Sequence, residues 1–227
     1  MRIVPKPIRK WLARLRGRED GWHLQNLRGV IHVGANTGQE RDIYAAHNLN
    51  VLWIEPIPSV FEELMANIAP YQHQKAVRAL VSDKTGEKTT LHIASNNGGS
   101  SSILPFKEHQ DIWPDITYID SICIESEILP DVLARAGHRI DSYDGLILDT
   151  QGSELMILRG AEHFLEKFRI IEIEVADFEP YKGCCTVNEV STFMRDHGFL
   201  EAHRMVVARR KGGGRYYEII YRNASLV

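Results

Sequence analysis

Short apolar runs alternate with segments of helical period along most of the chain, and this alternation is the feature that most limits the fold. The runs expected to form strands are residues 30–33, 51–54, 76–81, 119–124, 146–148 and 170–175. Between them, apolar residues recur every three or four positions, as in Leu155, Leu158 and Ala161, which indicates helices that bury one face. Strands separated by such helices favour βαβ units. The pattern therefore predicts an α/β, Rossmann-like fold with a mostly parallel sheet and helices on both faces.

The end of the chain departs from this alternation. Residues 200–208 and 216–221 both have the character of strands, and the glycines at 212–214 predict a tight turn between them. The sequence thus predicts an antiparallel C-terminal hairpin. Earlier in the chain, Ser59 followed three residues later by Glu62 predicts a capping box at the start of a helix.

The residues that follow the first two strands predict a site for a nucleoside-containing cofactor. In an open α/β sheet, ligands bind beyond the carboxyl ends of the strands. The first strand leads into the turn Gly34, Ala35, Asn36, Thr37, Gly38, Gln39. Its two glycines allow a tight bend and a close backbone approach to a ligand. Glu55 follows the second strand, where a carboxylate can accept hydrogen bonds from both hydroxyls of a ribose.

The spacing of the glycines narrows the choice of cofactor. Dinucleotide-binding turns follow the pattern G-x-G-x-x-G, and Asn36 stands where the middle glycine would be. Its side chain hinders the approach of a pyrophosphate, which makes an NAD-dependent oxidoreductase the weaker interpretation. The triphosphate-binding motif G-x-x-x-x-G-K-[ST] is absent from the sequence. A cofactor with a ribose and no phosphate, S-adenosylmethionine, fits best.

Several short motifs occur in a fixed order between residues 29 and 222. They are Ile31 to Glu40, Trp53 to Pro56, Leu80 to Asp83, Ser95 to Ser102, Asp149 to Glu154, Glu174 with Val175, and Tyr181 to Cys184. Together they resemble the FkbM family of methyltransferases. The resemblance implies the class I S-adenosylmethionine-dependent fold and O-methyltransferase activity. It also implies that the turn from Gly34 to Gly38 holds the amino-acid end of the cofactor, that Glu55 holds the ribose, and that Asp83 lies near the adenine. Gln39 and Ser82 are further candidates for binding the cofactor.

Two positions depart from the pattern that this family most often shows. Many members have Asp where this chain has His32, and the last conserved acid is usually Asp where this chain has Glu218. Because His32 lies inside an apolar strand, we expect it to be a hydrogen-bonded core histidine.

Carboxylates after the later strands are the candidates for the chemistry. Methyl transfer to a hydroxyl needs aligned reactants and a base that removes the proton. Asp149 follows the strand 146–148 and Glu174 is expected to end the next strand, so both should face one cleft. Glu154 is a third candidate, with stabilisation of a helix N-terminus as the alternative. A divalent metal between Asp149 and Glu174 is a further alternative, although the spacing points to no third ligand.

Two further segments are candidates for the acceptor side of the site. Residues 96–102 are rich in Gly, Ser and Asn and are predicted to lie over the cofactor or acceptor, with an ordinary connection as the alternative. His109 and Trp113 are candidates for lining an acceptor pocket, and simple solvent exposure is the alternative.

The first 18 residues differ in charge from the rest of the chain. They carry seven Lys and Arg and no acid, which leaves 20 basic and 30 acidic residues, a net charge of −10, in the remainder. Apolar residues Ile8, Trp11, Leu12 and Leu15 fall at helical spacing. We therefore predict a basic amphipathic arm over residues 1–21 and a methyltransferase domain over residues 22–227. The arm either contacts an anionic membrane or packs on the domain, and the acidic body argues against a nucleic-acid partner.

The expected activity follows from these features together. The sequence predicts transfer of a methyl group from S-adenosylmethionine to a hydroxyl oxygen of a saccharide, glycolipid or natural product. A non-catalytic cofactor-binding or scaffold domain of the same fold is the alternative. The odd number of cysteines, three, favours free thiols in a reducing compartment, and the arm lacks the apolar core of a signal peptide. We therefore expect a cytoplasmic protein, with peripheral contact at the inner face of the membrane if the arm docks there.

Overall fold

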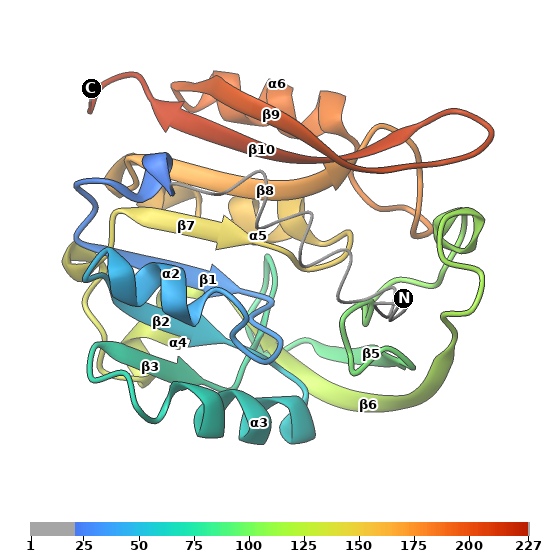
Figure 1. Ribbon diagram of the computed structural model, residues 1–227, viewed down its shortest axis with the longest axis horizontal. Coiled ribbons are helices and arrows are strands. Elements are labelled where there is room, and N and C mark those ends of the chain that lie inside the picture. Colours follow the sequence, from blue (N-terminus) through green and yellow to red (C-terminus); the bar gives the residue numbers. More distant parts are fainter. Residues whose placement is uncertain (1–20, 227) are drawn as a thin grey trace, which may run out of the picture.

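The computed structural model describes residues 21–226 and contains a central sheet of seven strands. They are β1 (Gly29–Val33), β2 (Asn50–Ile54), β3 (Gln74–Val77), β7 (Gly145–Leu148), β8 (Ile170–Ala176), β9 (Phe199–Arg209) and β10 (Arg215–Asn223). Their order across the sheet is β3-β2-β1-β7-β8-β10-β9 (Figure 1). The first five strands are parallel, and β10 runs antiparallel between β8 and β9. The predicted parallel sheet with an antiparallel C-terminal hairpin is confirmed.

Helices cover both faces of the sheet. They are α2 (Arg41–Ala46), α3 (Pro58–Ile68), α4 (Leu129–Arg135), α5 (Glu154–Gly160) and α6 (Val187–Asp196), with 3-10 turns η1 (Trp22–Leu24), η2 (His109–Asp111), η3 (Ile140–Ser142) and η4 (Glu162–Lys167). On one face, α4, α5 and α6 bury side chains such as Leu133, Leu158 and Met194. On the other face, Tyr44 of α2 packs on Trp53 of β2. The apolar residues that recur every three or four positions in the sequence are the ones that these helices bury against the sheet.

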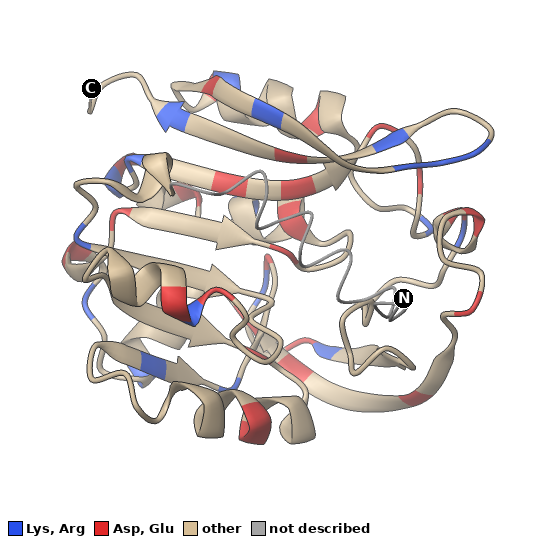
Figure 2. Cartoon of the chain, in the orientation of Figure 1, with Lys and Arg blue, Asp and Glu red and all other residues tan. Residues whose placement is uncertain are grey.

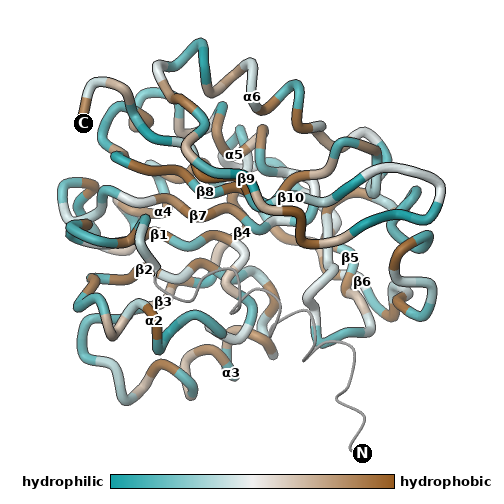
Figure 3. Tube along the Cα trace, turned by 45° about the horizontal axis from the view of Figure 1, so that its top comes forward, coloured by the Kyte–Doolittle hydropathy of each residue, from teal (hydrophilic) through white to brown (hydrophobic). Residues whose placement is uncertain are grey.

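The middle of the sheet is the core of the molecule. Strands β1 and β7 are buried along their whole length, and hydrophobic residues gather there in Figure 3. Strand β8 is buried too, but Glu172 and Glu174 alternate with its isoleucines (Figure 2). The sequence predicted that Glu174 ends this strand, and this prediction is wrong. The strand continues to Ala176 because β10 pairs along all of it, with Glu218 opposite Glu174.

The predicted strand 76–81 is divided between two sheets. Its first part belongs to β3, and its end forms β4 (Leu80–Val81), which pairs with β6 (Tyr118–Glu127). A second, three-stranded sheet results, in the order β4-β6-β5, where β5 is Lys88–Ala94. Leu80 and Leu91 of this small sheet pack on Ile57 and Val60 at the start of α3. Because both halves of the predicted strand are apolar, hydrophobic pattern alone could not reveal the break.

The predicted capping box at Ser59 is wrong. Helix α3 begins one residue earlier, with Ile57 as its N-cap and Pro58 in the first turn, where a missing N–H costs nothing. A capping box occurs instead at the start of α6, between Thr186 and Glu189. Ser59 is therefore the second residue of α3 and not its N-cap.

The proposed basic arm lies outside the described residues, apart from Gly21. Within residues 21–226, no helix is long and apolar enough to cross a membrane.

Candidate active site

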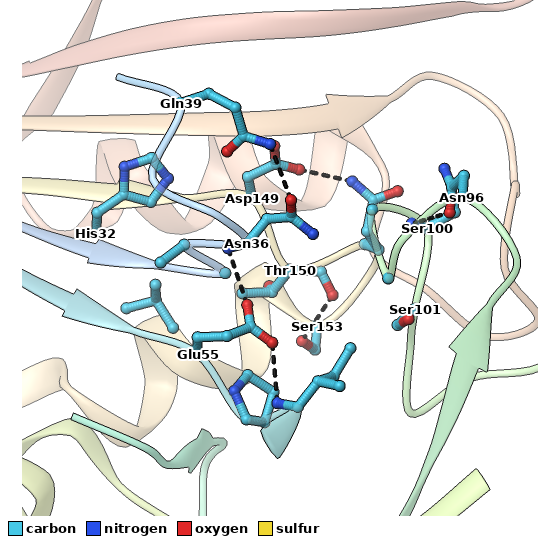
Figure 4. Close-up of a pocket in the computed structure, with 18 of the residues that line it drawn as sticks. His32, Asn36, Gln39, Glu55, Asn96, Ser100, Ser101, Asp149, Thr150 and Ser153 are labelled. Atoms are coloured by element: carbon cyan, nitrogen blue, oxygen red, sulfur yellow. Dashed lines mark hydrogen bonds between the residues drawn. The ribbon is translucent and has the colours of Figure 1, made fainter. Parts of the chain in front are cut away.

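A cavity of about 970 Å³ opens beyond the carboxyl ends of β1, β2 and β7. The Gly34 turn and Glu55 line one part of it, and residues of the segment between β5 and β6 line another. Figure 4 shows Glu55, Asn36 and Asp149 directed into the same space, although they come from three different strand ends. Its volume is at the upper end of the range typical of ligand pockets.

The Gly34 turn follows β1 and lies close to the backbone at the end of β7. Gly34 has a φ of +81°, and a Cβ atom there would lie 2.1 Å from the backbone oxygen of Asp149. The backbone amides of Gly34 and Ala35 both donate to the carbonyl of Ile54, which ties the turn to β2. Only glycine permits this approach, so the turn was correctly expected to need it.

The rest of the turn is held by side-chain amides. Asn36 adopts a φ of +45°, and its Oδ1 accepts a hydrogen bond of 2.8 Å from Gln39 Nε2. Gly38 has a φ of +72°, and a Cβ there would meet Leu64 Cδ1 at 2.7 Å. Gly34, Ala35, Asn36 and Gln39 line the cavity, whereas Gly38 shapes the turn behind it.

Glu55 is buried at the end of β2 and still reaches the cavity. Its two carboxylate oxygens accept the backbone N–H groups of Asn36 and Ile57, each at 2.9 Å. Burial raises the pKa of Glu55 to about 7, and the two hydrogen bonds only partly oppose this effect. The carboxyl group is therefore fixed in position and changes charge close to neutral pH.

Asp83, expected near the adenine, and Ser82, a further cofactor-binding candidate, do not line the cavity. Ser82 is buried, and its hydroxyl lies 3.3 Å from Asp83 Oδ1. The preceding residues Ala79, Leu80 and Val81 line the cavity instead and present an apolar surface at its Glu55 end. The planar face of a nucleoside base would pack better on this apolar surface than on the polar side chains of Ser82 and Asp83.

Asp149 lines the cavity directly after β7. Its Oδ1 accepts a hydrogen bond of 2.6 Å from Gln151 Nε2, and Gln151 Oε1 accepts one of 2.7 Å from the hydroxyl of Tyr181. Burial raises the pKa of Tyr181 well above its ordinary value, so this hydroxyl stays a donor. The three groups form a chain in which Tyr181 fixes the amide of Gln151 and the amide fixes Asp149.

Glu154 and Glu174 lie outside the cavity lining. Glu154 is buried beneath the loop after β7, where Oε1 accepts the backbone N–H groups of Thr150 and Gly152, both at 3.0 Å. Burial raises its pKa to about 7. Glu174 is buried in β8 opposite Glu218. Of the three carboxylates, only Asp149 lines the cavity. Glu154 is instead directed at the backbone amides of its own loop, and Glu174 lies within β8, paired with β10.

The Gly/Ser/Asn-rich loop, residues 96–102, forms one side of the cavity. Asn36 Nδ2 donates to the carbonyl of Asn97 at 2.9 Å, and this bond ties the loop to the Gly34 turn. Within the loop, Asn96 Oδ1 accepts the backbone N–H of Ser100 at 3.1 Å. The loop thus lines the cavity, and these hydrogen bonds give it a defined shape. That it covers a cofactor or acceptor stays a prediction.

The sequence predicted the positions of some other side chains around the cavity and missed those of others. His32 is buried, accepts or donates a 3.0 Å hydrogen bond with the hydroxyl of Tyr44, and stacks on Trp53, as expected of a core histidine. Trp113 lines the cavity, whereas His109 is buried behind it. Val207 and Ala208 of β9 also line it, and no signal in the sequence marked them. Among residues 21–226, no three His, Cys, Asp or Glu side chains are arranged to hold a metal ion.

The order of the sheet and its single antiparallel strand define the class I S-adenosylmethionine-dependent methyltransferase fold. PH0793 of Pyrococcus horikoshii superposes with a TM-score of 0.51 at 12% identity, covering 92% of this chain and 63% of that chain. Magnesium protoporphyrin IX methyltransferase (ChlM) from Synechocystis PCC 6803, with bound SAH, gives 0.50 at 11% identity, covering 97% of this chain and 89% of that one. Identities this low establish the fold alone.

The family is established by sequence. The methyltransferase FkbM domain matches residues 32–201, well over half of the chain, so the chain belongs to the FkbM methyltransferase family. The predicted resemblance is confirmed. The 2-O-methyltransferase NoeI of Sinorhizobium fredii (strain NBRC 101917 / NGR234) is 25% identical over 162 residues, 68% of this chain. The chain spans only 65% of the length of NoeI.

Proposed function

We propose that the protein transfers a methyl group from S-adenosylmethionine to a hydroxyl oxygen of a saccharide, glycolipid or related natural product. The observation that carries the proposal is that Glu55 and Asp149 line one cavity. Glu55 follows β2 and is the proposed ribose ligand, and Asp149 follows β7, on the other side of β1. NoeI is by name a 2-O-methyltransferase, which supports an oxygen acceptor.

The residues around the Gly34 turn fit this cofactor. Each carboxylate oxygen has two acceptor positions, so the two backbone bonds of Glu55 leave capacity for two ribose hydroxyls. Gln39 uses its amide nitrogen on Asn36 and keeps an acceptor oxygen for an ammonium group. The cofactor, when bound, supplies an electrophilic sulfonium methyl group.

Asp149 is proposed to take the proton of the acceptor hydroxyl. Gln151 and Tyr181 hold its carboxylate in one orientation, which reduces the cost of aligning it with an incoming hydroxyl. In this proposal Glu154 is a positioning residue, since it holds the loop that follows Asp149 by the amides of Thr150 and Gly152. Glu174 has no direct part in the reaction.

The Asp149→Asn variant tests this assignment. We expect the methylation rate to fall about 10²-fold or more, the usual scale for loss of a general base, with unchanged affinity for S-adenosylmethionine. Titration calorimetry measures the affinity, and transfer of labelled methyl groups to a panel of saccharides and glycolipids measures the rate. Asp141→Asn, an exposed aspartate in the η3 turn, is the matched control. An unchanged rate in Asp149→Asn would assign the base elsewhere, and a wild-type protein that binds the cofactor but methylates none of the panel would favour the non-catalytic alternative.

The division of the chain into an arm, residues 1–21, and a catalytic domain, residues 22–227, is also a proposal. Seven basic groups beside an apolar stripe support contact with an anionic lipid surface by an otherwise cytoplasmic enzyme. Such contact would hold the enzyme close to a lipid-linked acceptor.

A further inference from the structure

Tyr181 does not line the cavity, yet its hydroxyl is only two hydrogen bonds away from Asp149. The side chain is buried and comes from the loop between β8 and α6. We propose that Tyr181 is a positioning residue that fixes which end of the Gln151 amide faces Asp149, and thereby keeps Asp149 ionised and able to accept a proton. This inference rests on the proposed role of Asp149 as the base and adds a residue that controls the charge of that base.

The amide of Gln151 has two chemically different ends, and the structure uses both. Nε2 donates to Asp149 Oδ1 at 2.6 Å, the bond marked by the dashed line at Asp149 in Figure 4. Oε1 accepts a hydrogen bond of 2.7 Å from the hydroxyl of Tyr181. An amide turned by 180° would place Oε1, which can only accept, against a carboxylate oxygen. The turned arrangement is satisfied only when Asp149 carries a proton.

The hydroxyl of Tyr181 selects the first orientation. Burial raises the pKa of Tyr181 well above its ordinary value, so the hydroxyl keeps its proton and donates it to a hydrogen bond. Its bond to Gln151 is short, whereas the carbonyl of Ser100 lies 3.4 Å away. A turned amide would leave the hydroxyl with this longer bond. Tyr181 therefore favours donation from Gln151 to Asp149, and donation to a carboxylate favours its ionised form.

The backbone of Gln151 indicates that a glutamine side chain is needed at this position. Gln151 has a left-handed φ of +57°, and in residues 21–226 the other non-glycine residues with a positive φ are all asparagines. Asparagine and glycine adopt this conformation more readily than a longer side chain does. Ser102 holds the strained residue, since its Oγ donates to the carbonyl of Gln151 at 2.8 Å. Strain of this kind persists where the side chain has a function.

The pH dependence of Asp149 also reflects its other titratable and charged neighbours. Those that line the same cavity are His32, Glu40, Arg41, Asp42, Glu55 and Asp115, and the buried Glu154 and Glu174 lie behind it. All of these groups are the same in the wild type and in a variant of Tyr181. A difference in the titration of Asp149 between the two proteins therefore isolates the effect of the tyrosine hydroxyl.

The test follows the ionisation of Asp149 in the full chain by NMR, independently of catalysis. Carbon-13 labelling of aspartate carboxyl groups gives a titrating signal for each aspartate, and the signal missing from Asp149→Asn identifies Asp149. In Tyr181→Phe the ring stays and only the hydroxyl is lost. We expect the midpoint of the Asp149 signal to rise by about one pH unit, the scale of one hydrogen bond to a charged group. Methyl transfer should then fall by up to about tenfold below the midpoint and reach the wild-type rate well above it.

Matched variants separate this role from a general effect on folding. Tyr221→Phe removes another buried tyrosine hydroxyl, bonded to Ser191 Oγ at 2.9 Å and outside the cavity lining, and should leave the Asp149 signal unchanged. Gln151→Met removes the amide and should itself raise the midpoint. Because Tyr181 is proposed to act through Gln151, adding Tyr181→Phe to Gln151→Met should cause no further shift.

Three results are distinguishable. An unshifted Asp149 signal in a folded Tyr181→Phe would overturn the inference, and so would a full additional shift when Tyr181→Phe is combined with Gln151→Met. A wild-type protein that methylates no acceptor would instead sink the proposed function and leave the titration of Asp149, and its control by Tyr181, standing.

Discussion

The buried carboxyl group of Glu55 predicts that cofactor binding depends on pH near neutrality. Its pKa of about 7 means that about a tenth of the free protein carries the carboxylate at pH 6 and about nine tenths at pH 8. Ribose hydroxyls donate to the carboxylate and so stabilise the ionised form. Binding therefore lowers the pKa of Glu55, and below about pH 7 the protein must release a proton in order to bind.

The sign and size of the effect follow from this linkage. The dissociation constant of S-adenosylmethionine should be constant above about pH 7 and rise by up to about tenfold for each pH unit below it. In Glu55→Gln the group no longer titrates. The variant should also bind about 10- to 100-fold more weakly near pH 8, because hydrogen bonds to a charged acceptor are replaced by weaker ones.

Titration calorimetry in two buffers of different ionisation enthalpy measures both the affinity and the proton release. Titration of the cofactor's own groups is common to wild type and variants, so the difference between them isolates Glu55. Glu62→Gln, an exposed glutamate on α3, is the control for the same substitution at the surface. A wild-type affinity that does not change between about pH 6 and pH 8, or an unaltered pH dependence in Glu55→Gln, would refute the reasoning.

Two further predictions concern the turn and the arm. Gly34→Ala should lower the free energy of unfolding by about 2 kcal/mol or more beyond the loss in Gly86→Ala. Both glycines have a φ near +80°, so the backbone strain of the two variants is similar. Only at Gly34 would a Cβ atom meet backbone, 2.1 Å from the carbonyl oxygen of Asp149, whereas nothing lies within 4 Å of it at Gly86. Urea unfolding measures both variants, and equal losses would show that the close contact is not what requires glycine. Removal of residues 1–18 should abolish co-sedimentation with anionic vesicles at low salt, since each basic group near such a surface contributes about 1 kcal/mol and salt screens the attraction. Equal co-sedimentation of the full and shortened chains would end the proposal of membrane contact, and a large loss of melting temperature would favour packing on the domain.

The cavity positions of the residues proposed to bind the cofactor could be predicted from the sequence because these residues lie directly after strands. A short apolar run followed by Gly34, and another followed by Glu55, give each residue a position without any tertiary information. Ser82 shows the limit of this reasoning. Once the strand 76–81 divides between two sheets, the residues after it point elsewhere, and Ala79, Leu80 and Val81 take their place at the cavity.

The part of the cavity lined by residues 112–116 could not be predicted in the same way. Trp113 stood out only as an aromatic residue near His109, because this segment is positioned by contacts distant in sequence, such as the ion pair between Asp111 and Arg210. The prediction that Glu174 ends its strand was wrong for a similar reason. Pairing with β10 continues the strand past it, and the sequence around Glu174 carries no trace of that partner.

The turn at Gly34 contacts both the part of the candidate site around Glu55 and the part around Asp149. Its backbone approaches the carbonyl of Asp149 so closely that no side chain fits between them, and the same turn carries Asn36, which holds Glu55 by its amide and Asn97 by its side chain. A displacement of this turn therefore shifts the proposed ribose ligand, the proposed base and the Gly/Ser/Asn-rich loop together. Loss of activity in a Gly34 variant consequently says little about which function failed, whereas Glu55→Gln and Asp149→Asn leave the backbone contact intact. These two substitutions therefore separate cofactor binding from proton transfer better than a change at Gly34 does.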